Sequence, residues 1–170
     1  KVKRGDVFVA LEGSLSDGHD FVEQAIDQGT EVIVLEKLPQ DQSEEVSYIV
    51  VENSHEALAL MAANYYKNPS RDLKLIGVTG TNGKTTTTSL LYQLFRGLGY
   101  TSGLISTVEI MIDGKSIATK HTTPDPLTIN GHLAAMRDAG VDYCFMEVSS
   151  HGIAQERVTG LHFEGGVFTN

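Results

Sequence analysis

Seven consecutive residues, Gly80-Thr81-Asn82-Gly83-Lys84-Thr85-Thr86, combine the residue types that bind phosphate groups. Glycines allow successive backbone N–H groups to turn inward around an anion, and Lys84 adds a full positive charge. The hydroxyl of Thr85, directly after the lysine, can ligate Mg²⁺. The strict phosphate-loop spacing requires a glycine where this chain has Val78, so the match is partial. We expect this segment to bind phosphate, with Lys84 acting on the terminal phosphate groups.

An acidic residue, Glu147, closes the apolar segment Tyr143-Cys144-Phe145-Met146. In open parallel sheets, ligands bind beyond the carboxyl ends of the strands, and phosphate-loop proteins often hold Mg²⁺ through an acidic residue there. We therefore predict that Glu147 is catalytic, and that Glu147 and Thr85 hold the metal ion. The alternative is an ordinary surface glutamate at the end of a strand.

The residues that follow this segment indicate substrate contacts rather than nucleophilic catalysis. In Ser149-Ser150-His151, neither serine has the glycine two positions earlier that a nucleophile elbow requires. Arg157, close to Gln155, can neutralise an anionic substrate through two parallel hydrogen bonds, although a surface arginine is the plain alternative. The histidines show no zinc-ligand spacing, so no structural zinc site is expected.

Short apolar segments rich in β-branched residues alternate with helix-like segments, which predicts an α/β fold with a mainly parallel sheet. The predicted strands are residues 7–11, 32–35, 48–51, 73–78, 103–106, 108–112, 116–118, 141–148 and 165–169. The break Asn68-Pro69-Ser70-Arg71-Asp72 predicts a boundary between a small N-terminal α/β domain, residues 1–70, and a phosphate-loop domain, residues 71–170. The phosphate loop then lies between a strand and a helix, the context that phosphate binding requires.

Two predicted helices carry apolar residues at helical spacing. The helix after the phosphate loop is predicted to bury a face made of Leu90, Leu91, Leu94, Phe95 and Leu98. A helix from Ser54 is predicted to bury Leu58, Met61, Ala62 and Tyr65.

The composition narrows the classes of protein. The chain has 170 residues, 41% of them hydrophobic, and a net charge of −9, which is typical of a folded globular protein. Residues 1–70 carry 5 basic and 13 acidic side chains and no basic face, so a nucleic-acid partner is not expected. No apolar segment approaches the ~20 residues of a membrane-spanning helix, and no signal-peptide pattern is present. The single cysteine fits a reducing compartment, and we expect a piece of a longer cytoplasmic protein.

Several motifs, taken in order along the chain, resemble those of the Mur ligases. They are residues 78–86, Thr122-Thr123-Pro124, Glu147-Val148-Ser149-Ser150-His151-Gly152 and Val167-Phe168-Thr169-Asn170. The segment Gly5-Asp6-Val7-Phe8-Val9-Ala10 is similar to the N-terminal domain of the same family, so the resemblance covers essentially the whole chain.

The resemblance implies an ATP- and Mg²⁺-dependent ligase of peptidoglycan precursor synthesis, and hence a role in cell-wall biogenesis, cell shape and cell division. Such a ligase would join a diamino acid, meso-diaminopimelate or L-lysine, to UDP-N-acetylmuramoyl-L-Ala-D-Glu through an acyl phosphate. Residues 80–86 would bind ATP, and the sugar-nucleotide substrate would contact His121, Thr122, Thr123, Ser149, Gln155 and Arg157. On weaker similarity, the uridine part would lie beside Ser14, Leu15 and Ser16. This piece alone is expected to be inactive, because the family's C-terminal amino-acid domain would follow it.

Two other functions are compatible with the same phosphate loop. Folylpolyglutamate synthetase shares the loop, although the run Ser149-Ser150-His151-Gly152 argues against that type of ligase. A non-catalytic nucleotide-binding module would bind ATP without binding a muropeptide.

Overall fold

The computed structural model describes residues 2–13, 16–118 and 124–170. The chain forms two compact units, residues 1–58 and residues 59–170, and each is described by itself. Helix α2, Ser54–Tyr65, begins in the first unit and ends in the second. The division at residue 70 that the sequence predicts therefore stays a prediction. None of the helices in the described ranges combines the length and apolar character needed to cross a lipid bilayer.

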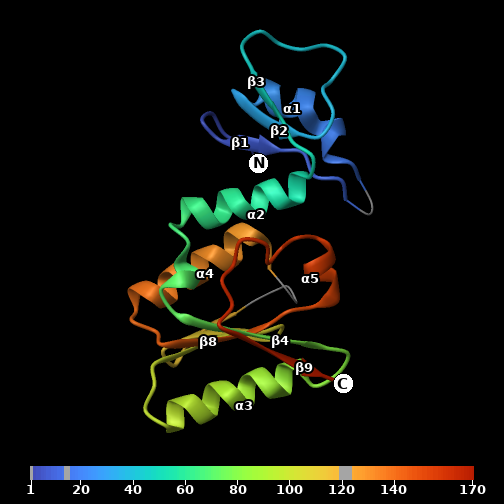
Figure 1. The fold of residues 1–170 in the computed structure, drawn as a ribbon. Helices are drawn as coiled ribbons and strands as arrows, with labels where there is room; N and C mark the ends of the chain where they lie inside the picture. The colour runs from blue at the N-terminus through green and yellow to red at the C-terminus, as the bar shows by residue number, and fades with distance from the viewer. Residues whose placement is uncertain (1, 14–15, 119–123) are drawn as a thin grey trace. The chain divides into compact units, whose positions relative to one another are not determined.

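The first unit is a small parallel sheet with a helix packed on it (Figure 1). Its strands, hydrogen-bonded in chain order, are β1, Val7–Val9, β2, Val32–Leu35, and β3, Ser47–Val50. The turn η1, Gly18–Phe21, leads into α1, Val22–Asp27. Val22 packs with Ile33 and Leu35 in the core of this unit. Because the strands are parallel, their carboxyl ends meet at one edge of this smaller sheet.

The second unit is built on a larger sheet, in which the described residues form six strands. In spatial order these are β7, Lys115–Ala118, β6, Glu109–Ile112, β5, Ser102–Ile105, β8, Tyr143–Glu147, β4, Lys74–Gly80, and β9, Gly165–Thr169. β5, β8, β4 and β9 run parallel, whereas β6 is antiparallel to both β5 and β7. The predicted α/β fold with a mainly parallel sheet is confirmed.

Helices cover both faces of the larger sheet (Figure 1). On one face lies α3, Lys84–Gly97; on the other lie α4, Pro126–Asp138, and α5, Ser150–Ala154, while η2, Pro69–Arg71, precedes β4. The side chains of β8 alternate between the faces, so Phe145 packs with Tyr92 of α3 while Cys144 and Met146 pack with Leu133 of α4. Burial raises the pKa of the Cys144 thiol, which fits its place in the core.

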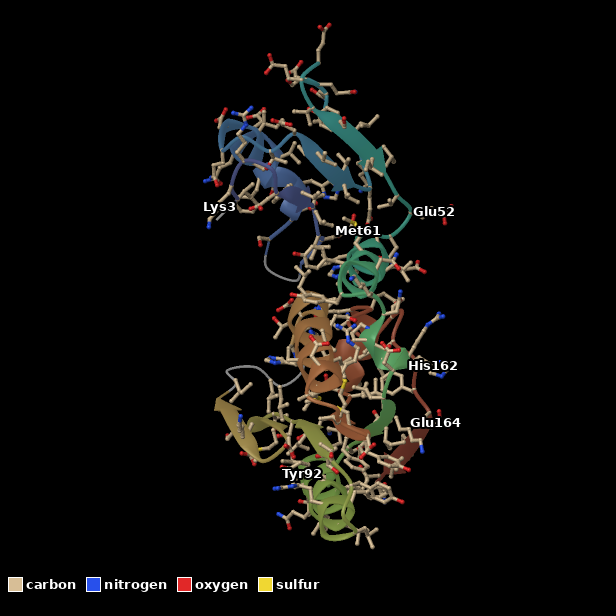
Figure 2. The ribbon with its side chains drawn as sticks, turned by 90° about the vertical axis from the view of Figure 1, so that its left-hand side faces the viewer. Lys3, Glu52, Met61, Tyr92, His162 and Glu164 are labelled. Carbon is tan, nitrogen blue, oxygen red and sulfur yellow. The ribbon has the colours of Figure 1, made fainter. Side chains whose placement is uncertain are left out.

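The structure corrects the buried face of α3. Leu90, Leu94 and Leu98 are 60%, 55% and 63% exposed, although the sequence predicts that they are buried. The prediction is confirmed for Leu91 and Phe95, which are partly buried against the core. The helix also turns Thr88 and Tyr92 toward the sheet, and Figure 2 shows Tyr92 between α3 and the strands. Burying Thr88 leaves no unsatisfied group, because its hydroxyl donates to the carbonyls of residues 84 and 85 at 2.9 and 3.0 Å.

The buried face of α2 also differs from the prediction. Its buried residues are Ser54, Ala59, Ala62 and Ala63, so the prediction is confirmed for Ala62, whereas Met61 and Tyr65 are exposed. Gly160 packs against this helix, since a Cβ at position 160 would lie 3.2 Å from the Leu60 Cδ2 and 3.5 Å from the Ala63 Cβ.

Candidate functional site

The carboxyl ends of the parallel strands in the larger sheet meet at one edge, which we call the phosphate edge. Gly80 ends β4, Glu147 ends β8 and Thr169 ends β9. The register pairs Val78 with Glu147 and Gly80 with Thr169, so these strand ends lie side by side. In open parallel sheets this edge is where ligands bind.

The loop between β4 and α3 is held against β9. The backbone N–H of Asn82 donates to the Asn170 carbonyl at 3.1 Å, and the Thr169 hydroxyl donates to the Thr79 carbonyl at 3.1 Å. Gly80 has a φ of +135°, and a Cβ at this position would lie 1.8 Å from the Thr169 carbonyl oxygen. Only glycine can be accommodated there, so the close approach of β9 fixes the start of the loop.

The N-terminus of α3 completes the loop. Gly83, with a left-handed φ of 82°, precedes Lys84, the first residue of the helix. The first N–H groups of a helix have no intrahelical acceptor and carry the positive end of the dipole, so they attract an anion. The Lys84 ammonium donates to the carbonyls of Gly80 at 2.7 Å and Thr81 at 3.1 Å, which places its charge over the loop. This arrangement matches the predicted phosphate-binding chemistry.

Glu147 is buried, with only 2% of its surface exposed, so it is not an ordinary surface glutamate. Its Oε1 accepts the backbone N–H of Thr107 at 3.1 Å, and its buried Oε2 has no hydrogen-bond partner within the described ranges. Because side chains alternate along a strand, Glu147 shares the face of Phe145, which packs toward α3. An unpartnered buried carboxylate oxygen is unfavourable, and a bound cation would stabilise it.

The oxygen ligands at the phosphate edge fit Mg²⁺. This ion usually keeps several waters and binds through one or two protein oxygens together with substrate phosphates. The Glu147 carboxylate and the Thr85 hydroxyl are hard oxygen donors of this kind. No group of three or more His, Cys, Asp or Glu side chains is placed to hold a metal ion within residues 2–13, 16–118 and 124–170. The donors therefore suit a metal ion shared with phosphate groups rather than a dedicated all-protein site.

The segment after Glu147 brings the predicted substrate residues Gln155 and Arg157 together. The Gln155 Oε1 accepts hydrogen bonds from the Arg157 Nε at 3.0 Å and Nη2 at 2.6 Å. The Gln155 amide nitrogen also contacts the His151 Nε2 at 3.1 Å. Ser149 caps α5, since its hydroxyl accepts the Gly152 N–H at 3.0 Å. Gln155 thus orients the guanidinium group, while Ser149 fixes the start of the helix that carries the segment.

The other predicted substrate residues are not joined to the phosphate edge by these contacts. Ser16 is exposed in the first unit, where its carbonyl accepts the Gly13 N–H at 3.0 Å. The remaining five lie outside the described residues: Ser14, Leu15, His121, Thr122 and Thr123.

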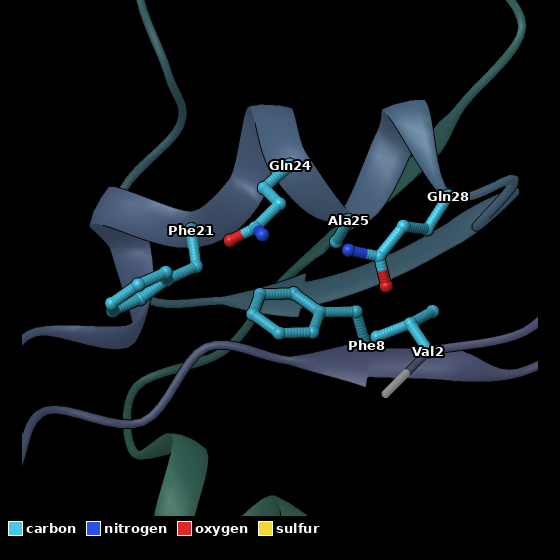
Figure 3. Close-up of a pocket in the computed structure, with 6 residues that line it drawn as sticks. All are labelled: Val2, Phe8, Phe21, Gln24, Ala25 and Gln28. Atoms are coloured by element: carbon cyan, nitrogen blue, oxygen red, sulfur yellow. The ribbon is translucent and has the colours of Figure 1, made fainter.

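The first unit has a hollow of about 610 Å³ between α1 and β1 (Figure 3). It is lined by Val2, Phe8, Phe21, Gln24, Ala25 and Gln28. None of these side chains is charged, and none belongs to the predicted site. Among the described residues, the hollow therefore offers amide groups but no cationic side chain to an anionic substrate.

Sequence reasoning missed Thr107 and Thr169 as residues that shape the site. Thr107 acts through its backbone N–H, which every residue type except proline offers, so the sequence carries no signal for it. Thr169 does have a signal, because the strand-like segment that it ends resembles a family motif. The strand that Thr169 ends, β9, pairs with β4, and this pairing allows the motif to support the phosphate loop.

The chain matches two sequence profiles and several known proteins. Residues 1–66 match the profile described as the Mur ligase family, catalytic domain, and residues 78–170 match the Mur ligase middle domain. A UDP-N-acetylmuramoyl-L-alanyl-D-glutamate–2,6-diaminopimelate ligase from Parabacteroides distasonis is 51% identical over 170 residues, which are 100% of this chain and 35% of the relative. The enzyme of the same name from Cytophaga hutchinsonii is 52% identical over 171 residues, again covering 35% of the relative.

Solved structures of related ligases superimpose on this chain. A structure named as a diaminopimelate ligase of the same kind superimposes with a TM-score of 0.78 and 26% identity, covering 100% of this chain and 34% of that one. MurF ligase from Thermotoga maritima in complex with ADP gives a TM-score of 0.55 and 30% identity, covering 88% of this chain and 30% of that one. The chain spans about a third of the length of the curated relatives that it matches. The matched middle-domain profile covers more than half of the sequence, and the chain belongs to the Mur ligase family.

Proposed function

We propose that the protein carrying this chain is an ATP-dependent ligase that joins diaminopimelate to UDP-N-acetylmuramoyl-L-Ala-D-Glu. The observation that carries the proposal is the phosphate edge, where Lys84 lies over a glycine loop that follows β4 and the paired strand β8 ends in a buried carboxylate. One oxygen of this carboxylate has no hydrogen-bond partner among the described residues. The names of the relatives, at about 50% identity, support this pair of substrates. A ligase that uses ATP and a UDP-sugar is proposed to work in the cytoplasm.

The chain's own residues suit phosphoryl transfer to a carboxylate, which brings two anions together. The loop N–H groups and the α3 N-terminus would bind the phosphates of ATP, and Lys84 would exchange its loop carbonyls for the terminal phosphate. Glu147 and Thr85 would hold Mg²⁺, which supplies further positive charge when bound. Such prearranged positive groups stabilise the charge that develops in the transition state.

The substrate that accepts the phosphoryl group is the D-Glu carboxylate of the muramoyl dipeptide. Arg157, oriented by Gln155, is proposed to contact this anionic substrate, because a guanidinium group binds carboxylates and phosphates through two parallel hydrogen bonds. Attack by the amine of diaminopimelate on the acyl phosphate then forms the amide bond and releases phosphate. Ser149, His121, Thr122 and Thr123 are proposed to contact the same substrate, and Ser14, Leu15 and Ser16 its uridine part.

The alternatives have less support. The relatives at 44–52% identity carry the name of the diaminopimelate-adding ligase, which favours neither a folylpolyglutamate-type ligase nor a non-catalytic module. Only the non-catalytic module would bind ATP without consuming it.

The test is phosphate release by the complete protein with substrates supplied one at a time. We expect release only when ATP, UDP-N-acetylmuramoyl-L-Ala-D-Glu and diaminopimelate are all present, with L-lysine a poor replacement. Release that does not depend on the muramoyl dipeptide would contradict the proposal. Turnover with L-lysine but not with diaminopimelate would retain the ligase and overturn the amino-acid assignment.

A further inference from the structure

The loop between β5 and β6, residues 106–108, lies at the phosphate edge beside Glu147. β5 and β8 are parallel and pair Ile105 with Met146, so the next residue of each segment, Ser106 and Glu147, reaches the same level at the carboxyl ends. The backbone N–H of Thr107 donates to the Glu147 Oε1 at 3.1 Å. The loop therefore supports the carboxylate that is proposed to hold the metal ion.

The Ser106 hydroxyl closes this loop. Ser106 is fully buried, and its Oγ donates to the Glu109 carbonyl at 2.9 Å. The same Oγ accepts the backbone N–H groups of Val108 at 3.4 Å and Glu109 at 3.2 Å. The backbone N–H of Ser106 also donates to the Glu109 carbonyl, at 3.0 Å. One hydroxyl thus ties the two residues after Thr107 back to the residue before it.

These contacts fix the direction of the Thr107 N–H, because the residues on both sides of Thr107 are joined through one buried atom. Packing contributes less, since Thr107 is only half-buried and Val108 is 63% exposed. Without the hydroxyl, the N–H groups of Val108 and Glu109 would bond to water, and the loop would open more easily. The order of the loop therefore depends on the Ser106 side chain.

We propose that Ser106 is a positioning residue for Glu147 at the metal site. Because a carboxylate group is planar, holding Oε1 on the Thr107 N–H also sets the direction of Oε2, the buried oxygen without a hydrogen-bond partner in the described ranges. A ligand that is already oriented binds a cation more tightly, since less freedom is lost on binding. Ser106 acts through Glu147 and need not touch the metal ion or ATP. The proposal rests on the proposed function, which assigns Mg²⁺ to Glu147.

The experiment compares two serine-to-alanine substitutions in the complete ligase. Ser106→Ala removes the hydroxyl that closes the loop. Ser102→Ala is the matched control, because Ser102 is also fully buried, begins β5 at its far end, and donates its hydroxyl to the Tyr100 carbonyl at 3.3 Å. Calorimetry measures the Kd of a non-hydrolysable ATP analogue with Mg²⁺ and, separately, with a chelator. The ratio of the two Kd values is the gain in affinity due to the metal ion.

We expect Ser106→Ala to lower this gain about fivefold, the scale of one lost hydrogen bond, and to leave the Kd without Mg²⁺ unchanged. Ser102→Ala should keep the wild-type gain. An unchanged gain in Ser106→Ala would overturn the proposal, as would an equal loss in both variants, which indicates a general structural defect. Failure of the proposed function would show separately, as wild-type phosphate release that does not depend on the muramoyl dipeptide.

A second measurement uses the wild type and does not depend on whether Ser106→Ala folds. Coupling between two events is reciprocal, so if the ordered loop strengthens Mg²⁺ binding, bound Mg²⁺ must stabilise the loop. Amide hydrogen exchange is followed by mass spectrometry in a peptide spanning residues 103–112, with α1 of the first unit as control. We expect Mg²⁺ to slow exchange in this peptide when the analogue is bound, and to leave α1 unchanged. Equal exchange of the peptide with and without Mg²⁺ would overturn the proposal.

Discussion

The two units present the same kind of surface, the carboxyl edge of a parallel sheet, but they hold it together differently. At the phosphate edge, backbone groups form most of the site: Gly80 allows β9 to approach closely, and the N-terminus of α3 supplies N–H donors. At the edge of the smaller sheet, side chains such as His19 and Glu36 tie one post-strand segment to the next. A backbone site needs particular residues at fixed spacing, whereas a side-chain network can be built from many combinations.

This difference explains why the phosphate edge can be predicted from the sequence, whereas the network at the edge of the smaller sheet cannot. Phosphate binding requires glycines, a lysine and a threonine in one short segment, and that pattern can be read directly. The hydrogen bonds around His19 join residues that are far apart in the chain, and none of these residues stands out in its own sequence context. The comparison makes distinct predictions for each unit, which follow from the largest expected effect to the smallest.

The first prediction tests the charge at the phosphate edge. Lys84→Ala in the complete ligase should lower the rate of ATP-dependent phosphate release about 10²–10³-fold, since the loop amides alone cannot neutralise the transferring phosphoryl group. Lys115→Ala is the control, because Lys115 is exposed at the start of β7 and should be neutral. Near wild-type activity in Lys84→Ala would remove the lysine from the phosphate site.

The second prediction tests whether the backbone contact is needed for folding. Gly80→Ala should lower the free energy of unfolding by about 3 kcal/mol, because the added Cβ meets the Thr169 carbonyl and φ is strained. Gly97→Ala is the matched control, since a Cβ at Gly97 meets nothing within 4 Å and alanine favours the helix. Calorimetry of the complete protein should show a lower melting temperature for the first variant and an equal or slightly higher one for the second. Equal melting temperatures would show that β9 can move aside.

The third prediction concerns Glu147, whose buried Oε2 has no hydrogen-bond partner among the residues that the structure describes. Glu147→Gln should raise the Mg²⁺ concentration needed for half-maximal activity about tenfold, because the neutral amide is a weaker ligand for a hard cation. Glu164→Gln, an exposed glutamate in the same unit, serves as control. An unchanged Mg²⁺ titration would exclude Glu147 from the metal site.

The structure also shows which parts of the fold the sequence can specify. The alternation of strands and helices in the larger sheet follows from the strand and helix patterns of the sequence. The face of α3 follows only in part from apolar spacing, because Leu91 and Phe95 pack against the core, whereas Leu90 and Leu94 are exposed. Thr88 is buried with its hydroxyl satisfied by the helix. The spacing of apolar residues in the sequence locates an apolar face of a helix. The packing of the helix against the sheet decides which face is buried.

The same reasoning separates what was predictable in the candidate site. Glu147 could be predicted from its place at a strand end, and its burial adds the physical reason for a cation. The contact of Thr107 with Glu147 could not be predicted, because it uses a backbone N–H of the loop between β5 and β6, which is distant in the chain. Site residues that act through the backbone need the topology before they can be found.

The smallest expected effect compares how the two units respond to mild acid. Burial lowers the pKa of His132 below its ordinary 6.5, with Asp125 partly opposing this shift, so the folded protein resists protonating His132. As pH falls below about 6.5 the unfolded chain binds the proton first, and the second unit loses stability until the lowered pKa is reached. Asp17 in the first unit has a pKa below 3.8 and stays ionised in this range.

Between pH 8 and pH 5.5, calorimetry should therefore show the wild type losing stability relative to His132→Gln, by less than about 1 kcal/mol because the ring is partly solvated. The effect of Asp17→Asn should be the same at both pH values. A constant difference between wild type and His132→Gln would mean that His132 is as easily protonated in the fold as in water, and the contrast between the two units would then not extend to their response to acid.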